Sequence, residues 1–206
     1  MRNKLFGFIL AVFLIFGISS SGAAITLADV GDPDDLIAVG NGAGLDSEAA
    51  EINFIYTVTG VDVEFYYKYD TASELDALNI TNLNSGWAWD FDLFTPDYYL
   101  VKVGKGEGAA IEYSHWLFAN NFNTQYAYIL NGTYDGIEYW TYTGPGSGTF
   151  NYEGVVNGLL IGDAWIEAIS HIARAGGTPV PEPGMVILLG IGLIGLAFFS
   201  RKRLLN

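Results

Sequence analysis

The sequence predicts a mainly β protein: a single antiparallel β-sandwich or jelly-roll-like exported domain, preceded by a signal peptide and followed by one C-terminal transmembrane helix. Three observations predict this class. Runs of alternating polar and apolar residues, rich in aromatic and β-branched side chains, recur through the middle of the chain. Gly, Asn and Asp turn signals separate these runs, and no long amphipathic helix interrupts them. The expected divisions are residues 1–24, 25–177 and 178–206.

The N-terminal 24 residues have the organisation of a secretory signal peptide. Arg2 and Lys4 precede an uncharged apolar run at residues 5–18, and small or polar residues follow at 19–24. These are the basic, hydrophobic and cleavage regions of an export signal, and cleavage is expected after Ala24. The alternative interpretation is an N-terminal anchor that stays uncleaved.

The exported segment is strongly acidic and contains no cysteine. Residues 25–180 hold 22 acidic residues against four basic ones, and the whole chain has a formal net charge of −14. A nucleic acid needs a basic face that displaces its counterions, so nucleic acid is excluded as a partner, and anionic lipid headgroups are disfavoured for the same reason. Cations, neutral sugars and basic proteins remain possible partners. Without cysteine, disulfides, thiolate metal sites and a cysteine nucleophile are excluded.

Two β-hairpins are predicted first. Residues 51–70 alternate in polarity on both sides of Thr59-Gly60, which predicts a hairpin with one buried face. Residues 97–103 and 110–119 flank the glycine-rich segment 104–108 and predict a second hairpin.

The rest of the middle region contains further strands and two ambiguous stretches. Residues 124–130 and 137–143 are predicted strands, separated by the turn dipeptides Asn131-Gly132 and Asp135-Gly136. Residues 71–83 fit a short helix, and residues 163–175 fit both helical spacing and strand alternation.

The tail predicts a membrane-spanning helix. Residues 184–200 carry no charge, and at roughly 1.5 Å per residue they span about 25 Å, close to the hydrocarbon core of a bilayer. The stop-transfer residues Arg201, Lys202 and Arg203 place the end of the chain in the cytoplasm by the positive-inside rule. A buried core helix is the alternative, but such a helix normally has only one apolar stripe.

The sequence Pro181-Glu182-Pro183 stands directly before this helix. The prolines hold the chain extended, which suits a stiff spacer or a protease substrate, and physical reasoning alone does not separate the two. However, PVPEPG followed by a short apolar helix and a basic RKR resembles the PEP-CTERM sorting signal, and Pro181, Glu182 and Pro183 match its motif. That signal is found on exported proteins of Gram-negative bacteria that make exopolysaccharide.

The resemblance implies a partner and a location. An exosortase, which is an integral membrane transpeptidase-like enzyme, reads such tails and is thought to cut near the motif. The expected precursor is therefore anchored in the inner membrane, and the exported domain then reaches the cell surface or the medium.

Candidate binding residues in the exported domain are of three kinds. Asp32, Asp34 and Asp35 offer oxygen ligands of the kind that Ca²⁺ prefers, but their spacing is not that of the twelve-residue Ca²⁺ loop, so a solvated acidic loop is the favoured interpretation. No other cofactor is expected. His115 and His171 lie far apart in the sequence and are interpreted as packed, hydrogen-bonded residues, with metal ligands as the less favoured alternative. A buried aromatic core is the favoured interpretation of the aromatic density, and glycan contact through Trp87, Trp89, Tyr98 and Tyr99 is the alternative.

These observations favour a non-enzymatic protein of the cell envelope or extracellular matrix, one hypothesis being that it associates with exopolysaccharide. A secreted glycan-binding module or carbohydrate-active enzyme with two carboxylates is the first alternative. The chain contains no G-x-S-x-G, HExxH or P-loop motif, which disfavours the enzyme. A permanently membrane-anchored structural protein is the second alternative.

Overall fold

The computed structural model describes residues 24–64, 66–92, 94–104, 112–121, 124–144, 148–176 and 178–179. The predicted signal peptide up to residue 23, most of the glycine-rich segment 104–108 and the predicted membrane helix at 184–200 lie outside these residues. Within the described ranges, no helix has the length and apolar character needed to cross a membrane.

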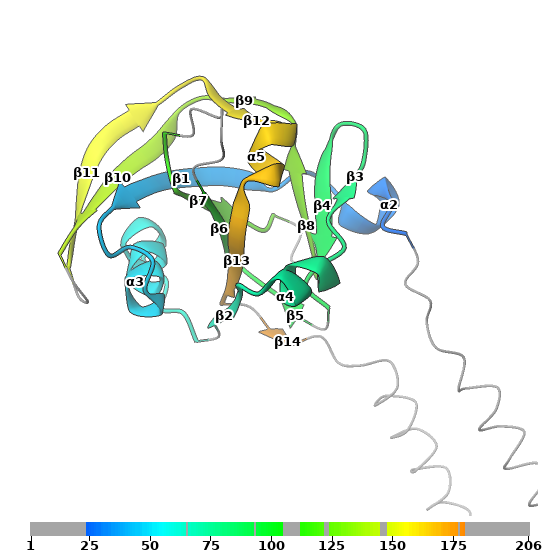
Figure 1. Ribbon diagram of the computed structural model, residues 1–206, viewed down its shortest axis with the longest axis horizontal. Helices are drawn as coiled ribbons and strands as arrows, with labels where there is room; N and C mark the ends of the chain where they lie inside the picture. The colour runs from blue at the N-terminus through cyan, green and yellow to red at the C-terminus, as the bar shows by residue number, and fades with distance from the viewer. Residues whose placement is uncertain are drawn as a thin grey trace, which may run out of the picture.

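A seven-stranded sheet dominates the fold (Figure 1). Its strands are, in spatial order, β11 (Thr149–Val156), β10 (Ile137–Thr143), β1 (Asp35–Gly42), β7 (His115–Ala119), β6 (Tyr98–Val103), β13 (Ile169–Ala175) and β2 (Tyr66–Tyr69). Neighbouring strands are antiparallel except β1 and β10, which run parallel. The mainly β class is thus confirmed.

Three small sheets and four helices complete the described part of the chain. The small sheets pair β12 (Leu159–Ile161) with β9 (Gly132–Tyr134), β14 (Thr178–Pro179) with β5 (Phe94–Thr95), and β4 (Gly86–Asp90) with both β3 (Thr81–Asn82) and β8 (Tyr126–Leu130). The helices are α2 (Leu27–Val30), α3 (Glu48–Thr59), α4 (Ala72–Ala77) and α5 (Asp163–Glu167). A sandwich or jelly roll is not confirmed, because the large sheet is faced by a helix on one side and by small sheets and short helices on the other.

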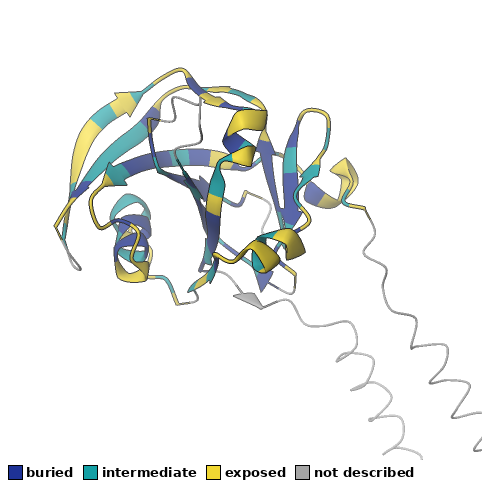
Figure 2. Cartoon of the chain, in the orientation of Figure 1, coloured by how far each residue is buried: buried dark blue, intermediate teal, exposed yellow. Residues whose placement is uncertain are grey.

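Alternation along the central strands builds a core on each face of the large sheet. In β6, Tyr99 and Val101 pack with Trp116 of the neighbouring β7 and with Trp89 and Trp165 from the small sheets and α5, whereas Leu100 points to the opposite face and packs with α3. The central strands are therefore buried, while β11 at the edge is mostly exposed (Figure 2). Burial on both faces is the main source of stabilisation in such an arrangement.

Helix α3 corrects the first predicted hairpin. Ser47 caps the helix by accepting a hydrogen bond from the backbone N–H of Ala50, and Gly60 ends it in the left-handed conformation with its N–H bonded to Tyr56. Its buried apolar residues Ala50, Phe54 and Ile55 recur at helical spacing. Among the described residues of the predicted hairpin, Tyr66–Tyr69 form the one strand, and it pairs with β13 instead.

The later elements follow the sequence more closely. Strands β6 and β7 form the second predicted hairpin, and β8 and β10 confirm the predicted strands on either side of the Asn-Gly and Asp-Gly turns. The two ambiguous stretches are settled as well. Residues 71–83 contain helix α4, whereas residues 163–175 divide into helix α5 and strand β13.

Candidate functional site

Strand register places three polar residues in one row on the α3 face of the sheet. Lys102 of β6 is paired with His115 of β7 on one side and with His171 of β13 on the other. Paired residues of antiparallel strands point to the same face. The two imidazole rings consequently approach each other, with 6.1 Å between their centroids.

Helix α3 adds a carboxylate to this row. Glu51 Oε1 lies 3.0 Å from His171 Nε2 and 3.7 Å from His115 Nε2. Glu51 and His115 are completely buried, and His171 is nearly so. Opposite His115 on β1 stands Gly40, where a Cβ would lie only 3.1 Å from the Phe54 ring, so the absence of a side chain there lets α3 pack close to the sheet. We call Glu51, His115 and His171 the buried triad.

Two further side chains of β2 bind the carboxylate of the triad. Lys68 Nζ lies 3.0 Å from Glu51 Oε1, and the Tyr66 hydroxyl donates to Oε2. At the edge of the cluster, Lys102 Nζ forms an ion pair of 2.7 Å with Asp46, whose side chain is largely exposed. Asp46 Oδ1 is also 3.6 Å from His115 Nε2. The cluster therefore runs from a buried carboxylate to the surface.

The surroundings set the charge of the cluster. Burial alone would raise the pKa of Glu51, but His115, His171 and Tyr66 outweigh it and hold that pKa well below its usual range. Burial lowers the pKa of His115, against the opposing influence of Glu51. Burial and the adjacent Glu51 raise the pKa of Tyr66 far above its ordinary value. Glu51 is accordingly an anion, and Tyr66 a neutral donor, at physiological pH.

The buried triad has the residue types and the spacing of a metal site. One ligand atom from each of its three residues lies within 4.8 Å of the other two, and among the described residues no other such group is found. The sequence alone does not indicate this group, because the alternation of residues 51–70 predicts a hairpin, in which Glu51 has no special place. The signals that identify α3 are Ser47 before it, Gly60 after it and the apolar residues between them. A helix there places Glu51 on the same buried face as Phe54 and Ile55.

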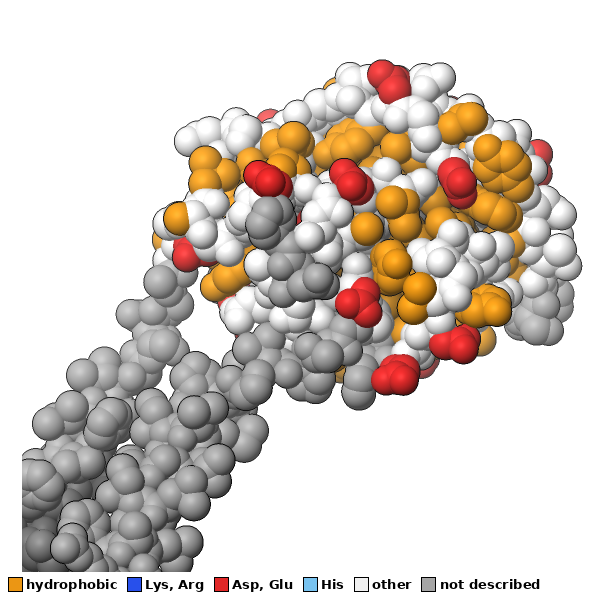
Figure 3. All heavy atoms as spheres, turned by 180° about the vertical axis from the view of Figure 1, so that it is seen from behind, with side chains coloured by type: hydrophobic (Ala, Val, Ile, Leu, Met, Phe, Trp, Pro, Cys, Tyr) orange, Lys and Arg blue, Asp and Glu red, His pale blue; other side chains and the backbone are white. Residues whose placement is uncertain are grey.

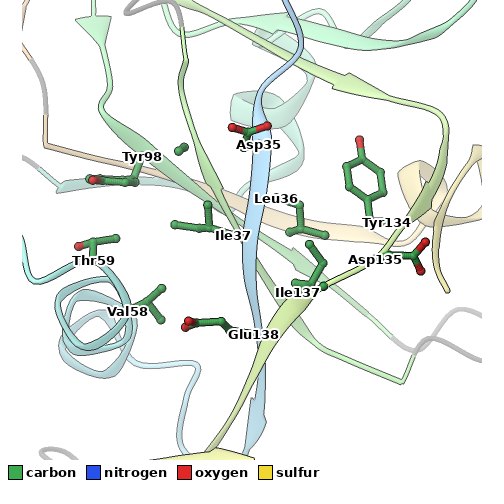
Figure 4. Close-up of a pocket in the computed structure, with 12 residues that line it drawn as sticks. Asp35, Leu36, Ile37, Val58, Thr59, Tyr98, Tyr134, Asp135, Ile137 and Glu138 are labelled. Atoms are coloured by element: carbon green, nitrogen blue, oxygen red, sulfur yellow. The ribbon is translucent and has the colours of Figure 1, made fainter. Parts of the chain in front are cut away.

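A separate open pocket of about 710 Å³ lies between β1, the end of α3 and the start of β10 (Figure 4). Leu36, Ile37 and Ile137 supply apolar side chains in the close-up, and Tyr98 and Tyr134 lie on either side of them. Three carboxylates also line this pocket: Asp35, Asp135 and Glu138. The buried triad takes no part in it.

The predicted Ca²⁺ residues do not act alike. Asp34 is buried and accepts hydrogen bonds from the Tyr99 hydroxyl and from the backbone N–H groups of Tyr128 and Asn121. Burial raises its pKa to about 6 against the effect of these donors. Asp32 and Asp35 are exposed. Asp34 is thereby explained as an internal anchor of three chain segments.

The predicted glycan residues divide between core and surface. Trp89 and Tyr99 are completely buried in the core between the large sheet and the small sheets, so they offer no face to a sugar ring. Trp87 and Tyr98 are partly exposed, and Tyr98 lines the open pocket. Glycan contact stays a prediction for these two residues.

The predicted sorting and stop-transfer residues, at 181–183 and 201–203, lie outside the described residues. Residues 179–203 match the family model of the PEP-CTERM protein-sorting motif. The chain matches no curated protein and no solved structure.

Proposed function

We propose that this protein is a non-enzymatic component of the cell envelope or extracellular matrix that an exosortase processes and whose exported domain binds a neutral polysaccharide. The observation that carries the proposal is the PEP-CTERM sorting motif at residues 179–203, which marks a protein exported and targeted to an exosortase. The membrane helix predicted within that motif holds the precursor until the enzyme acts on it.

The open pocket supports a sugar as the ligand. Its carboxylates accept hydrogen bonds from sugar hydroxyls, while the rings of Tyr98 and Tyr134 suit the apolar faces of pyranose rings. The Tyr134 hydroxyl already donates to the backbone carbonyl of Leu130, which fixes the orientation of that ring. Glu138 is likewise held, because it accepts a hydrogen bond from the indole N–H of Trp140.

Charge selects among polysaccharides. Three carboxylates in one pocket repel uronic acid and sulfate groups, so a neutral chain suits the site better than an anionic one. The surface supports the same choice, because the face in Figure 3 shows acidic side chains among apolar ones and no Lys or Arg among its described residues. The absence of familiar hydrolase motifs from the sequence favours binding over catalysis.

The test is binding of the full-length protein, in detergent, to neutral and anionic polysaccharides. The double variant Tyr98→Ala/Tyr134→Ala should bind a neutral polysaccharide about tenfold more weakly, because two ring contacts are lost. Tyr67→Ala is the matched control, since Tyr67 is an exposed tyrosine on the edge strand β2, away from the pocket. Equal binding by all three proteins, or binding of the anionic polysaccharide alone, would contradict the proposal.

A further inference from the structure

We propose that the buried triad of Glu51, His115 and His171 binds a transition-metal ion, with Zn²⁺ as the best match. This inference goes beyond the proposed function, because neither the sorting motif nor the open pocket involves these residues. It is carried by the convergence of three ligand atoms and by two buried imidazole nitrogens that lack a well-formed hydrogen bond.

The separations of the ligand atoms fit a tetrahedral ion. Zn²⁺ binds imidazole nitrogen and carboxylate oxygen at about 2.0–2.2 Å, so two ligands of a tetrahedral ion lie roughly 3.3–3.6 Å apart. The distances from Glu51 Oε1 to the two Nε2 atoms, 3.0 Å and 3.7 Å, lie on either side of that range. The ligand atoms of the triad all lie within 4.8 Å of one another, so side-chain adjustments that draw them together let the triad hold an ion.

Hydrogen bonding directs the lone pair of His115 toward the centre of the triad. The Ser114 hydroxyl lies 3.3 Å from the carbonyl of Gly40 and 2.8 Å from His115 Nδ1, and both hydrogen bonds form together only when Ser114 donates to the carbonyl and accepts from Nδ1. Nδ1 of a neutral ring then carries the proton and Nε2 the lone pair. Such a bond to the second nitrogen is the arrangement that orients metal-binding histidines.

Both inward-facing nitrogens lack a well-formed hydrogen bond. The Glu51 carboxylate lies 3.7 Å from His115 Nε2 and 3.0 Å from His171 Nε2, but neither buried nitrogen has a partner with hydrogen-bond geometry. A buried polar atom without a partner is costly. A cation at the centre would supply the missing partner to both rings at once.

The ligand types and the exposed edge identify the class of metal. Two imidazoles and one carboxylate suit zinc and its transition-metal neighbours, whereas Ca²⁺ and Mg²⁺ prefer sites made of oxygen. Asp46, exposed and 3.6 Å from His115 Nε2, lies at the edge of the site, outside the converging set of ligand atoms, and marks the route by which an ion enters. Lys102 holds this carboxylate at the edge of the site.

Lys68 competes with the metal for Glu51. Its ammonium group is 3.0 Å from Glu51 Oε1, so a divalent ion at the same oxygen repels it. The side chain is partly exposed and also lies 3.3 Å from the backbone carbonyl of Asp46, which offers it an alternative partner. In the metal-free protein Lys68 neutralises Glu51, and on binding it moves aside.

The experiment titrates ZnCl₂ into full-length protein that has been stripped with a chelator and kept in detergent, with affinity read by calorimetry. Cobalt substitution supplies a second measurement, because visible absorption reports tetrahedral Co²⁺. One equivalent of zinc should bind. Glu51→Gln and His171→Ala should weaken binding by about 100-fold or more, and Ser114→Ala by about tenfold because it loses only the orienting bond. Asp135→Asn, in the open pocket, is the control and should bind zinc normally.

Lys68→Ala separates metal binding from a merely structural polar cluster. If the triad is structural, this variant only loses an ion pair. If it binds metal, removal of the competing ammonium should tighten zinc binding by about tenfold. This test holds even where Glu51→Gln or His171→Ala fails to fold. Absence of stoichiometric zinc binding, or an affinity unchanged in Ser114→Ala and Lys68→Ala, would overturn the proposal.

Discussion

Asp34 connects three segments that are distant in the sequence. Its two oxygens accept hydrogen bonds from the Tyr99 hydroxyl at 2.9 Å, the Tyr128 N–H at 2.8 Å and the Asn121 N–H at 3.1 Å. Tyr99 belongs to the large sheet and Tyr128 to the small sheet of β3, β4 and β8. One buried carboxylate therefore joins the two sheets at the start of β1.

Loss of this carboxylate should be severe. Asp34→Ala leaves three donors without their partner, two of them in buried surroundings, at roughly 1–3 kcal/mol for each buried group left unsatisfied. We expect the free energy of unfolding to fall by about 3 kcal/mol or more, as measured by urea denaturation of the full-length protein. Asp32→Ala removes an exposed carboxylate and should change the same quantity by less than about 0.5 kcal/mol. Similar values for the two variants would refute the anchoring role.

Among the helices and strands, α3 matters most for the candidate site, because it places Glu51 against the two histidines of the sheet. Its N-terminus depends on Ser47, whose hydroxyl accepts from the N–H of Ala50 at 3.3 Å. Glu48 and Glu51 lie in the first turn, where a negative charge is favourable to the helix dipole. The helix then packs Phe54 against Phe150 of β11, with ring centroids 5.3 Å apart, as β10 and β11 curve past it (Figure 1).

The cap can be tested directly. Ser47→Ala should lower the free energy of unfolding by about 1 kcal/mol, since a first-turn N–H loses its acceptor. Ser47→Asp keeps an acceptor at the same position and should restore most of the stability. Thermal and urea unfolding of the three proteins would measure the difference. If the Ala and Asp variants were equally stable, the hydroxyl would not be acting as a cap.

The same helix shows what alternation can and cannot predict. Residues 51–58 alternate in polarity, yet Ala50, Phe54, Ile55 and Val58 also follow a helical stripe, and the capping residues at both ends decide between the two patterns. The prediction of strands β6 and β7 is confirmed, because a glycine-rich segment separates two apolar and aromatic runs there. A short pattern of polar and apolar residues therefore predicts secondary structure where it fits either strand alternation or helical spacing, but not both.

The buried triad was beyond the reach of local patterns. His115 and His171 are brought together only because both pair with Lys102, which is a property of strand register. The turn of the hairpin constrains the register of β6 against β7, but β13 comes from a distant part of the chain, and its register against β6 follows from tertiary packing. By contrast, the sorting motif was identifiable at once, since it is a contiguous stretch of sequence.

At the scale of the whole molecule, the described basic residues are all engaged. Lys68 binds Glu51, Lys102 binds Asp46, and the Arg174 guanidinium lies 4.1 Å from the centre of the Phe94 ring and donates to the carbonyl of Phe91. No described cation is left to form a basic patch, whereas acidic side chains are numerous. This charge distribution disfavours adhesion to anionic surfaces.

The central claim is that the tail directs processing, and it is tested most directly by mass. We would measure the intact mass and map the C-terminal peptides of the protein from native envelope and from the medium, beside Glu182→Ala. Glu167→Ala, which removes an exposed acid from α5, is the control. We predict that the wild type and the control lose the segment after Pro181-Glu182-Pro183 while the Glu182 variant retains it. Full-length wild-type protein in both fractions would contradict this account and leave the tail as a permanent anchor.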